Sequence, residues 1–343
     1  MVGKVLDRFG KWYASCEVPP YVYAGPRAAL MPPDLVLSWL AKRSYGAYRM
    51  WDWWANATGG TLASTRTPIR EDTAETYRFD ERYVEEIRKN GVAPISNAFP
   101  KQWIDEVHGY IMELHQKAKQ GLERRRGEKG PWTDDQVTWL DESGIRFDCY
   151  LEHERYRFYF PTQLEQTRNL PKWVGEYLRL PEARSIFQAY YGQGVVWGNP
   201  YLMGEVLCPG RRLENWHFDC ARKGMKAFLY VNDVGEKQGP LRVLHGTQHA
   251  DERMRFQRFR VCRSGLKEAY YDDRTNAEYD QRGTSVVAPA GTLLLFDTTT
   301  VHAGSLCSEG MRVTLINGFR PANSMRINPR VLPNLPPVPT GGR

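Results

Sequence analysis

The pattern of hydrophobic and polar positions divides the chain into a helical front part and a strand-rich back part. Residues 81–90 predict a short helix ended by Gly91, followed by a short strand. A longer helix is expected from about 100 to 119, and its apolar stripe consists of Ile104, Val107, Ile111, Leu114 and Ala118. The charged stretch from Gly121 to Gly130 indicates a loop. A second helical region is expected at about 171–191, interrupted by Pro181.

From residue 195 onward, short apolar runs separated by Pro and Gly predict strands. The expected strands are 195–198, 201–207, 215–218, 226–231, 240–244, 285–288, 292–297 and 312–318. Many short strands behind a helical part favour a mainly β fold with flanking helices, as in a β-sandwich or a jelly roll.

Three segments stand apart from this pattern. Residues 1–80 are rich in Pro, Gly and Trp without sustained periodicity, and we expect them to wrap the main body because large rings seldom stay in water. Residues 250–284 are polar and connect two strands; a connection of this length is usually functional, so we expect a lid. Residues 321–343 form a Pro-rich tail, expected to be extended. The remaining segment, 81–320, is the expected functional domain.

Composition narrows the class of protein. Hydrophobic residues make up 41% and aromatic residues 13%, enough for a core built around large rings. The net charge of +7 is compatible with an anionic small molecule or with nucleic acid, but the charge is spread along the chain, so nucleic acid is not favoured. No apolar run approaches the length of a membrane helix, the first residues lack the apolar core of a signal peptide, and no two cysteines form a Cys-x-x-Cys pair. These features predict a cytoplasmic protein with reduced thiols.

The stretch WHFDC carries the first candidate chemistry. His217 and Asp219 lie two apart in a predicted strand and would project from the same face. The pair alone is weak evidence, since His249 and Asp251 repeat the spacing in a turn and such pairs arise by chance. His302, which follows the apolar run GTLLLFDTTTV, supplies a third candidate ligand. Two histidines and one carboxylate make the facial triad of non-haem Fe(II) oxygenases, which leaves metal positions open for a co-substrate and O2.

Arg312 and Thr314, which follow His302 in the sequence, form a candidate binding site for a carboxylate, here called the clamp. Arg312 begins the predicted strand RVTLIN, and Thr314 shares its face. A buried guanidinium with a hydroxyl beside it suits bidentate binding of a carboxylate. A dicarboxylic 2-oxoacid could therefore contact the metal at one end and Arg312 at the other.

These pieces occur in an order that resembles a known family. The similar segments are 89–92 with 97–100, 216–219, 239–241 followed by 246–249, and 291–297 through 302–304 to Arg312. Over roughly 82–320 the chain resembles the phytanoyl-CoA dioxygenase-like branch of the Fe(II)/2-oxoglutarate oxygenases. The resemblance implies a double-stranded β-helix (a cupin-like jelly roll) and the use of Fe(II), 2-oxoglutarate and O2. It also implies that His217, Asp219 and His302 hold iron and that Arg312 holds the distal carboxylate of the oxoacid.

The sequence departs from the family at one turn and keeps the acidic ligand. Leu244 and His245 precede Gly246 where the family usually has a Pro, which affects a turn; we expect His245 and His249 to be turn residues. Asp219 stands where related halogenases have a small residue, which disfavours halogenation. The residue that binds the C1 carboxylate of the oxoacid varies in the family and is not assigned.

The leading hypothesis is a dioxygenase that hydroxylates a C–H bond of a small organic substrate, giving succinate and CO2. Desaturation, cyclisation or epimerisation would use the same cofactors, because the outcome depends on substrate placement within about an ångström. A hypothesis of another class is a non-catalytic basic binding module, against which the intact triad argues. Aromatic richness and positive charge favour a small or medium-sized organic substrate, anionic ones included.

Overall fold

The computed structural model describes residues 79–125, 136–150, 154–161, 169–192, 195–210, 214–219, 224–249, 271 and 273–321. The expected wrapping segment, apart from its last two residues, lies outside this part of the chain. So do residues 250–270 of the expected lid and the tail after residue 321. Within the described residues, no helix is both long and apolar enough to cross a membrane.

The described elements are five helices and twelve strands. The helices are α4 (Arg82–Asn90), α5 (Lys101–Arg125), α7 (Lys172–Arg179), α8 (Pro181–Tyr191) and α10 (Asp273–Arg282). The strands are β1 (Val92–Ile95), β2 (Gln136–Leu140), β3 (Arg146–Tyr150), β4 (Arg155–Phe160), β5 (Val195–Leu207), β6 (Glu214–His217), β7 (Met225–Tyr230), β8 (Leu241–Val243), β9 (Thr284–Val286), β10 (Leu293–Asp297), β11 (His302–Gly304) and β12 (Arg312–Pro321).

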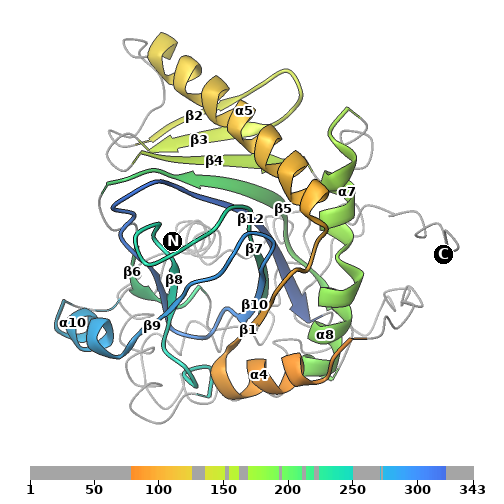
Figure 1. Ribbon diagram of the computed structural model, residues 1–343, viewed down its shortest axis with the longest axis vertical. Coiled ribbons are helices and arrows are strands. Elements are labelled where there is room, and N and C mark those ends of the chain that lie inside the picture. The colour runs from red at the N-terminus through yellow and green to blue at the C-terminus, as the bar shows by residue number, and fades with distance from the viewer. Residues whose placement is uncertain are drawn as a thin grey trace, which may run out of the picture.

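The strands form two antiparallel sheets. The larger has the order β1-β10-β7-β12-β5-β4-β3-β2 and the smaller β6-β11-β8-β9 (Figure 1). Apolar side chains from both sheets meet in one interior: Phe228 and Ile316 come from the larger sheet, Leu241 and Val243 from the smaller. The fold is the double-stranded β-helix with flanking helices that the sequence predicts.

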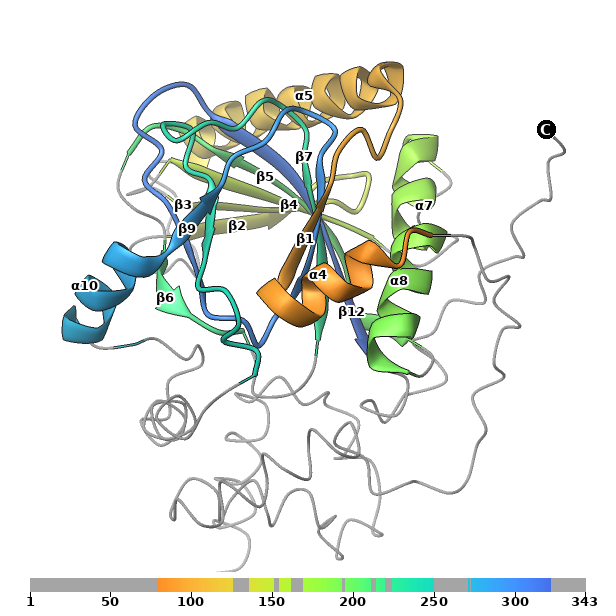
Figure 2. The same ribbon diagram turned by 60° about the horizontal axis from the view of Figure 1, so that its bottom comes forward.

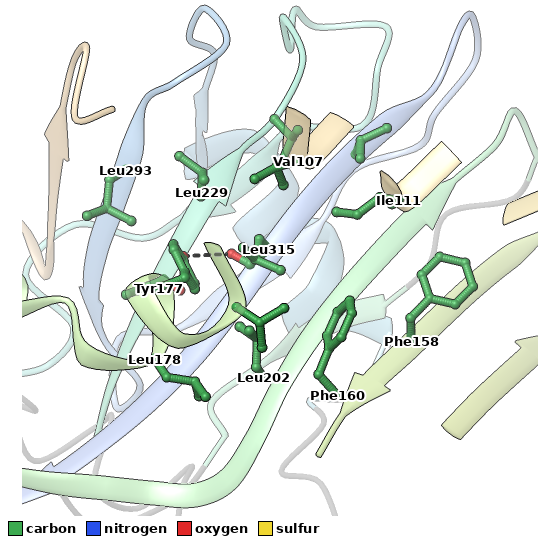
Figure 3. Close-up of a cluster of buried hydrophobic side chains, with 14 of the residues drawn as sticks. Val107, Ile111, Phe158, Phe160, Tyr177, Leu178, Leu202, Leu229, Leu293 and Leu315 are labelled. Carbon is green, nitrogen blue, oxygen red and sulfur yellow. Dashed lines mark hydrogen bonds between the residues drawn. The ribbon is translucent and has the colours of Figure 1, made fainter. Parts of the chain in front are cut away.

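Helices α5, α7 and α8 lie on the other side of the larger sheet (Figures 1 and 2). The alternation of β12 explains this, since Val313 and Leu315 pack in the outer core while Thr314 and Ile316 point into the interior. Figure 3 shows Tyr177 of α7 in the outer core; its hydroxyl lies 2.9 Å from the carbonyl oxygen of Leu315 and 3.1 Å from that of Ala227. This contact ties α7 to two neighbouring strands.

The helix predictions are confirmed with one correction. Helix α4 ends at Gly91, which adopts the left-handed conformation at φ 80°, and Pro181 begins α8. Helix α5 runs on to Arg125, so the prediction of a loop beginning at Gly121 is wrong. The reason is that Leu122 continues the stripe of Ala118 and is itself buried.

The strand predictions hold for most of the back part but miss four strands. The two strands expected within 195–207 are one strand, β5, and β2, β3, β4 and β11 were not predicted. The sequence of β4, RYRFYF, has the period-two alternation of a strand: Phe158 and Phe160 are buried while Arg157 and Tyr159 are less so. The sequence of β11, HAG, shows no alternation of apolar and polar residues that would predict a strand.

Gly91 offers a test of the junction between α4 and β1. A Cβ at this position would meet Thr300 Oγ1, and the positive φ disfavours any L-side chain. We expect Gly91→Ala to lower the free energy of unfolding by at least about 2 kcal/mol. Gly109→Ala is the matched control, because Gly109 lies in α5 with no atom near its Cβ position; there alanine should stabilise by about 0.5–1 kcal/mol. Denaturant unfolding of both variants measures this, and equal effects would contradict it.

His115 predicts a pH dependence of stability. This side chain is buried in the outer core. The centroid of its ring lies 4.6 Å from that of Tyr156, and its Nε2 lies 3.8 Å from Cys208 Sγ. Burial, and secondarily Lys119, lowers the pKa of His115 from 6.5 to about 4. The folded state thus binds the proton less readily than the unfolded state. The contribution of His115 to the free energy of unfolding is therefore fully present above pH 6.5 and is lost as the pH falls towards 4.

Between pH 6.5 and pH 4, protonation of His115 should lower the free energy of unfolding by up to about 3 kcal/mol. Replacing it by the apolar residue of similar size, His115→Leu, should make the free energy of unfolding less dependent on pH between 6.5 and 4. Denaturant unfolding at several pH values provides the measurement. Identical slopes for the two proteins would contradict the prediction.

A candidate metal centre

Three side chains from the paired strands β6 and β11 and the loop after β6 meet at one point. His302 lies directly opposite His217 in the strand pairing, with ring centroids 4.3 Å apart. Asp219 Oδ1 lies 3.8 Å from His217 Nε2, and Oδ2 lies 3.7 Å from His302 Nε2. One ligand atom from each residue falls within 4.8 Å of the others. The structure thus brings together the three residues that the sequence predicts as metal ligands.

Backbone carbonyls orient both imidazoles. His217 Nδ1 lies 2.8 Å from the carbonyl oxygen of Asn215, and His302 Nδ1 lies 2.8 Å from that of Thr300. A proton on each Nδ1 satisfies these contacts and leaves Nε2, the atom that faces Asp219, unprotonated. Burial, and then the neighbouring His217, lowers the pKa of His302 to about 4, so its imidazole is neutral at physiological pH. A neutral ring is the form that binds metal.

Asp219 is held in its ionised form. Burial alone would raise the pKa of its carboxyl, but the Lys226 ammonium and the two imidazoles outweigh that effect and lower the pKa to about 2. Its backbone N–H donates to the carbonyl oxygen of Thr298, 3.1 Å away, in the loop between β10 and β11. Asp297 fixes that loop, since it accepts from the backbone N–H of Thr299 at 2.8 Å and from the Tyr190 hydroxyl at 2.7 Å.

Lys226 is a residue of this centre that the sequence analysis missed. Its ammonium lies 2.7 Å from Asp219 Oδ2 and 5.9 Å from the centroid of the Phe296 ring. It is the one charged residue of β7, whose sequence is MKAFLY, and strand alternation places it on the interior face with Phe228 and Tyr230. A lone charge on the buried face of an apolar strand was the signal that could have found it.

The predicted clamp lies on the same interior. Arg312 and Thr314 share the inner face of β12, and both are buried. The Arg312 guanidinium donates through Nη2 to Glu205 Oε1 at 2.9 Å and through Nη1 to the Gly239 carbonyl. Arg312 Nε and Thr314 Oγ1 are buried without a hydrogen-bond partner among the described residues. Buried donors of this kind are rare unless a ligand satisfies them, so this pair fits a carboxylate.

Glu205 is a second residue that the sequence analysis missed. Glu205 lies in β5, is buried, and pairs with the Arg312 guanidinium. No pattern in the sequence indicates this contact. His245 and His249, by contrast, are exposed and contact the last carbonyls of α4, those of Asn90 and Arg88. These two histidines are turn residues, as expected.

Two imidazole nitrogens and one carboxylate oxygen form a donor set that suits Fe(II) and leaves coordination positions open. The model of one protein family, Phytanoyl-CoA dioxygenase (PhyH), matches residues 87–313, which is more than half of the chain and includes His217, Asp219, His302 and Arg312. The chain belongs to the phytanoyl-CoA dioxygenase family. It is a non-haem iron, 2-oxoglutarate-dependent enzyme whose cofactor is Fe(II) and whose co-substrates are 2-oxoglutarate and O2.

The comparison with solved structures gives matches at low sequence identity. The carbocyclase SnoK from nogalamycin biosynthesis has a TM-score of 0.47 at 14% identity, over 71% of this chain and 85% of that chain. HygX from Streptomyces hygroscopicus, with nickel and 2-oxoglutarate bound, has a TM-score of 0.46 at 11% identity over 71% and 88%. EvdMO1 has a TM-score of 0.43 at 16% identity. The match covers 70% of this chain and 50% of the EvdMO1 chain. No curated protein matches the sequence.

The contact of Lys226 with Asp219 predicts a competition with metal. A divalent cation must share the carboxylate with an ammonium that repels it. We therefore expect Lys226→Met to bind Mn(II), used as an oxygen-stable stand-in for Fe(II), roughly tenfold more tightly than the unaltered protein. Calorimetric titration of the metal-free proteins measures the dissociation constants.

Lys237→Met is the matched control for this titration. Lys237 pairs with Glu309 on the surface, where both side chains are more than half exposed, so its loss should leave Mn(II) affinity unchanged. Weaker Mn(II) binding by Lys226→Met would show instead that the ammonium holds Asp219 in place for the metal.

Proposed function

We propose that the enzyme oxidises a C–H bond of a small organic substrate by hydroxylation, with conversion of 2-oxoglutarate to succinate and CO2. The observation that carries the proposal is the convergence of His217, Asp219 and His302 in an interior that also holds the partnerless donors of Arg312 and Thr314. One end of a dicarboxylic oxoacid could bind a metal held by the triad, and the carboxylate at its other end could accept hydrogen bonds from Arg312 and Thr314.

Each group has a separate task in this proposal. His217, Asp219 and His302 would hold Fe(II), which supplies the activation of O2 when bound. Arg312 and Thr314 would hold the distal carboxylate and so fix the oxoacid in one orientation. The apolar residues Phe228, Phe296 and Ile316 line the same interior and exclude water from it.

The proposed substrate is a small or medium-sized organic molecule, and anionic groups on it would be favoured. Lys226 supports this preference, because its ammonium lies beside the metal site with its side chain 23% exposed. An anion that enters the site would therefore meet a positive charge near the metal. Product analysis distinguishes hydroxylation from desaturation, cyclisation or epimerisation, which would use the same residues.

The direct test is iron-dependent succinate formation. With Fe(II), ascorbate and 2-oxoglutarate, the purified protein should bind iron and release succinate slowly even without the organic substrate. His217→Ala and His302→Ala should each lose iron binding and reduce succinate formation by at least about a hundredfold, because the metal loses one of three ligands. His108→Ala, outside the site on α5, is the matched control and should behave as the unaltered protein.

Iron content and chromatographic measurement of succinate give the two readouts. A folded, unaltered protein that binds neither Fe(II) nor 2-oxoglutarate would refute the proposed function.

A further inference from the structure

Glu205 lies at the centre of a buried group of arginines. Its Oε1 accepts from Arg312 Nη2 at 2.9 Å. Its Oε2 accepts from Arg155 Nε at 2.7 Å and from Arg157 Nε at 3.0 Å. The Glu205 side chain is 1% exposed, so these ion pairs form away from bulk water. One carboxylate thus shares its charge among three guanidinium groups.

The strand register explains why these side chains meet. Strands β12, β5 and β4 are neighbours in the larger sheet. In the strand register, Glu205 of β5 lies between Thr314 of β12 and Arg157 of β4. Two residues further along the same face, Leu207 of β5 lies between Arg312 and Arg155. All of these side chains project from the inner face, the face that carries the proposed oxoacid site.

The division of the Glu205 oxygens has an electrostatic consequence for Arg312. A carboxylate that paired with Arg312 alone would neutralise it, and a second carboxylate would then gain little by binding there. Arg155 and Arg157 draw the charge of Glu205 towards Oε2, so Arg312 stays only partly neutralised. Such differences are large in a buried site, where charges are poorly screened.

We propose that Glu205, together with Arg155 and Arg157, sets the strength with which Arg312 binds the distal carboxylate, and so selects a dicarboxylic oxoacid as co-substrate. The inference rests on the proposed function, since it needs Arg312 to be the residue that binds this carboxylate. Glu205 and its two partners are positioning and charge-tuning residues, which act through Arg312 and do not contact the reacting atoms.

The test compares two oxoacids on metal-loaded protein without O2. 2-Oxoglutarate carries the distal carboxylate, and 2-oxopentanoate has the same carbon chain without it. Dissociation constants from calorimetric titration of the Mn(II)-loaded protein need no turnover and no organic substrate.

The expected changes have opposite signs. Arg157→Gln leaves more of the Glu205 charge to Arg312, so 2-oxoglutarate should bind roughly three- to tenfold more weakly. Glu205→Gln keeps a hydrogen-bond acceptor but removes the charge, so 2-oxoglutarate should bind more tightly by a similar factor. The dissociation constant of 2-oxopentanoate should stay the same in both variants.

A role in folding alone would give a different result. It would weaken both oxoacids in both variants, or change both by the same factor, and either outcome would overturn the inference. Arg282→Gln is the matched control, because Arg282 forms an exposed pair with Glu278 and should leave both constants unchanged. Should Glu205→Gln fail to fold, as judged by its thermal unfolding, Arg157→Gln decides, since that side chain is 19% exposed and lies at the rim of the group.

Arg312→Met separates this inference from the proposed function. If Arg312→Met leaves the affinity for 2-oxoglutarate unchanged, the assignment of the carboxylate clamp fails and the inference fails with it. If Arg312→Met weakens 2-oxoglutarate binding while Arg157→Gln and Glu205→Gln change nothing, the clamp stands and only the role of Glu205 is refuted.

Discussion

The pairing of β6 with β11 is the constraint on which the candidate site depends. It places His302 opposite His217, and the carbonyls of Asn215 and Thr300 then turn both Nε2 atoms towards Asp219. The two strands have four and three residues, so they could not hold this geometry by themselves. The loop after β10 supplies the missing rigidity, because Asp297 ties it to Tyr190 of α8 and Thr298 binds the backbone of Asp219.

Two groups of buried charge share one apolar interior. Asp219 with Lys226 lies at the metal site, and Glu205 with its arginines lies beside the clamp. Phe228 stands between the two along β7 and β12, since Lys226 is two residues before it and the Arg312 guanidinium lies 5.6 Å from the centroid of its ring. In both groups an acid already has a cationic partner before any ligand is bound. A buried charge left alone would be costly, so these pairs stabilise the interior around the candidate site.

Sequence patterns were enough for the fold class and for the faces that the candidate residues share, because strand alternation is a local signal. The carboxylate clamp of Arg312 and Thr314 stays a prediction. His217 and Asp219 lie two apart in a strand, and Arg312 and Thr314 do the same. Glu205 could not be placed in this way, since Arg155, Arg157 and Arg312 come from strands distant in the sequence. Lys226 stands close to Asp219 in the sequence, and its lone charge in β7 was a signal that the sequence analysis did not use. The end of helix α5 depends on tertiary packing, here the burial of Leu122. What the sequence left out is therefore mainly the charge balance of the interior.

The described ends of the expected lid contact elements that help to position the candidate ligands. At one end His249 contacts the last turn of α4, whose C-terminal Gly91 binds the β10–β11 loop through its carbonyl oxygen and the N–H of Asp297, 2.9 Å apart. At the other end α10 packs on the strand that carries His217: Asp280 accepts from Trp216 Nε1 at 3.0 Å and from Arg242 Nη1 at 2.8 Å. Trp216 is adjacent to His217 in β6 and points to the opposite face. A displacement of α10 would thus act on the backbone that positions a proposed ligand.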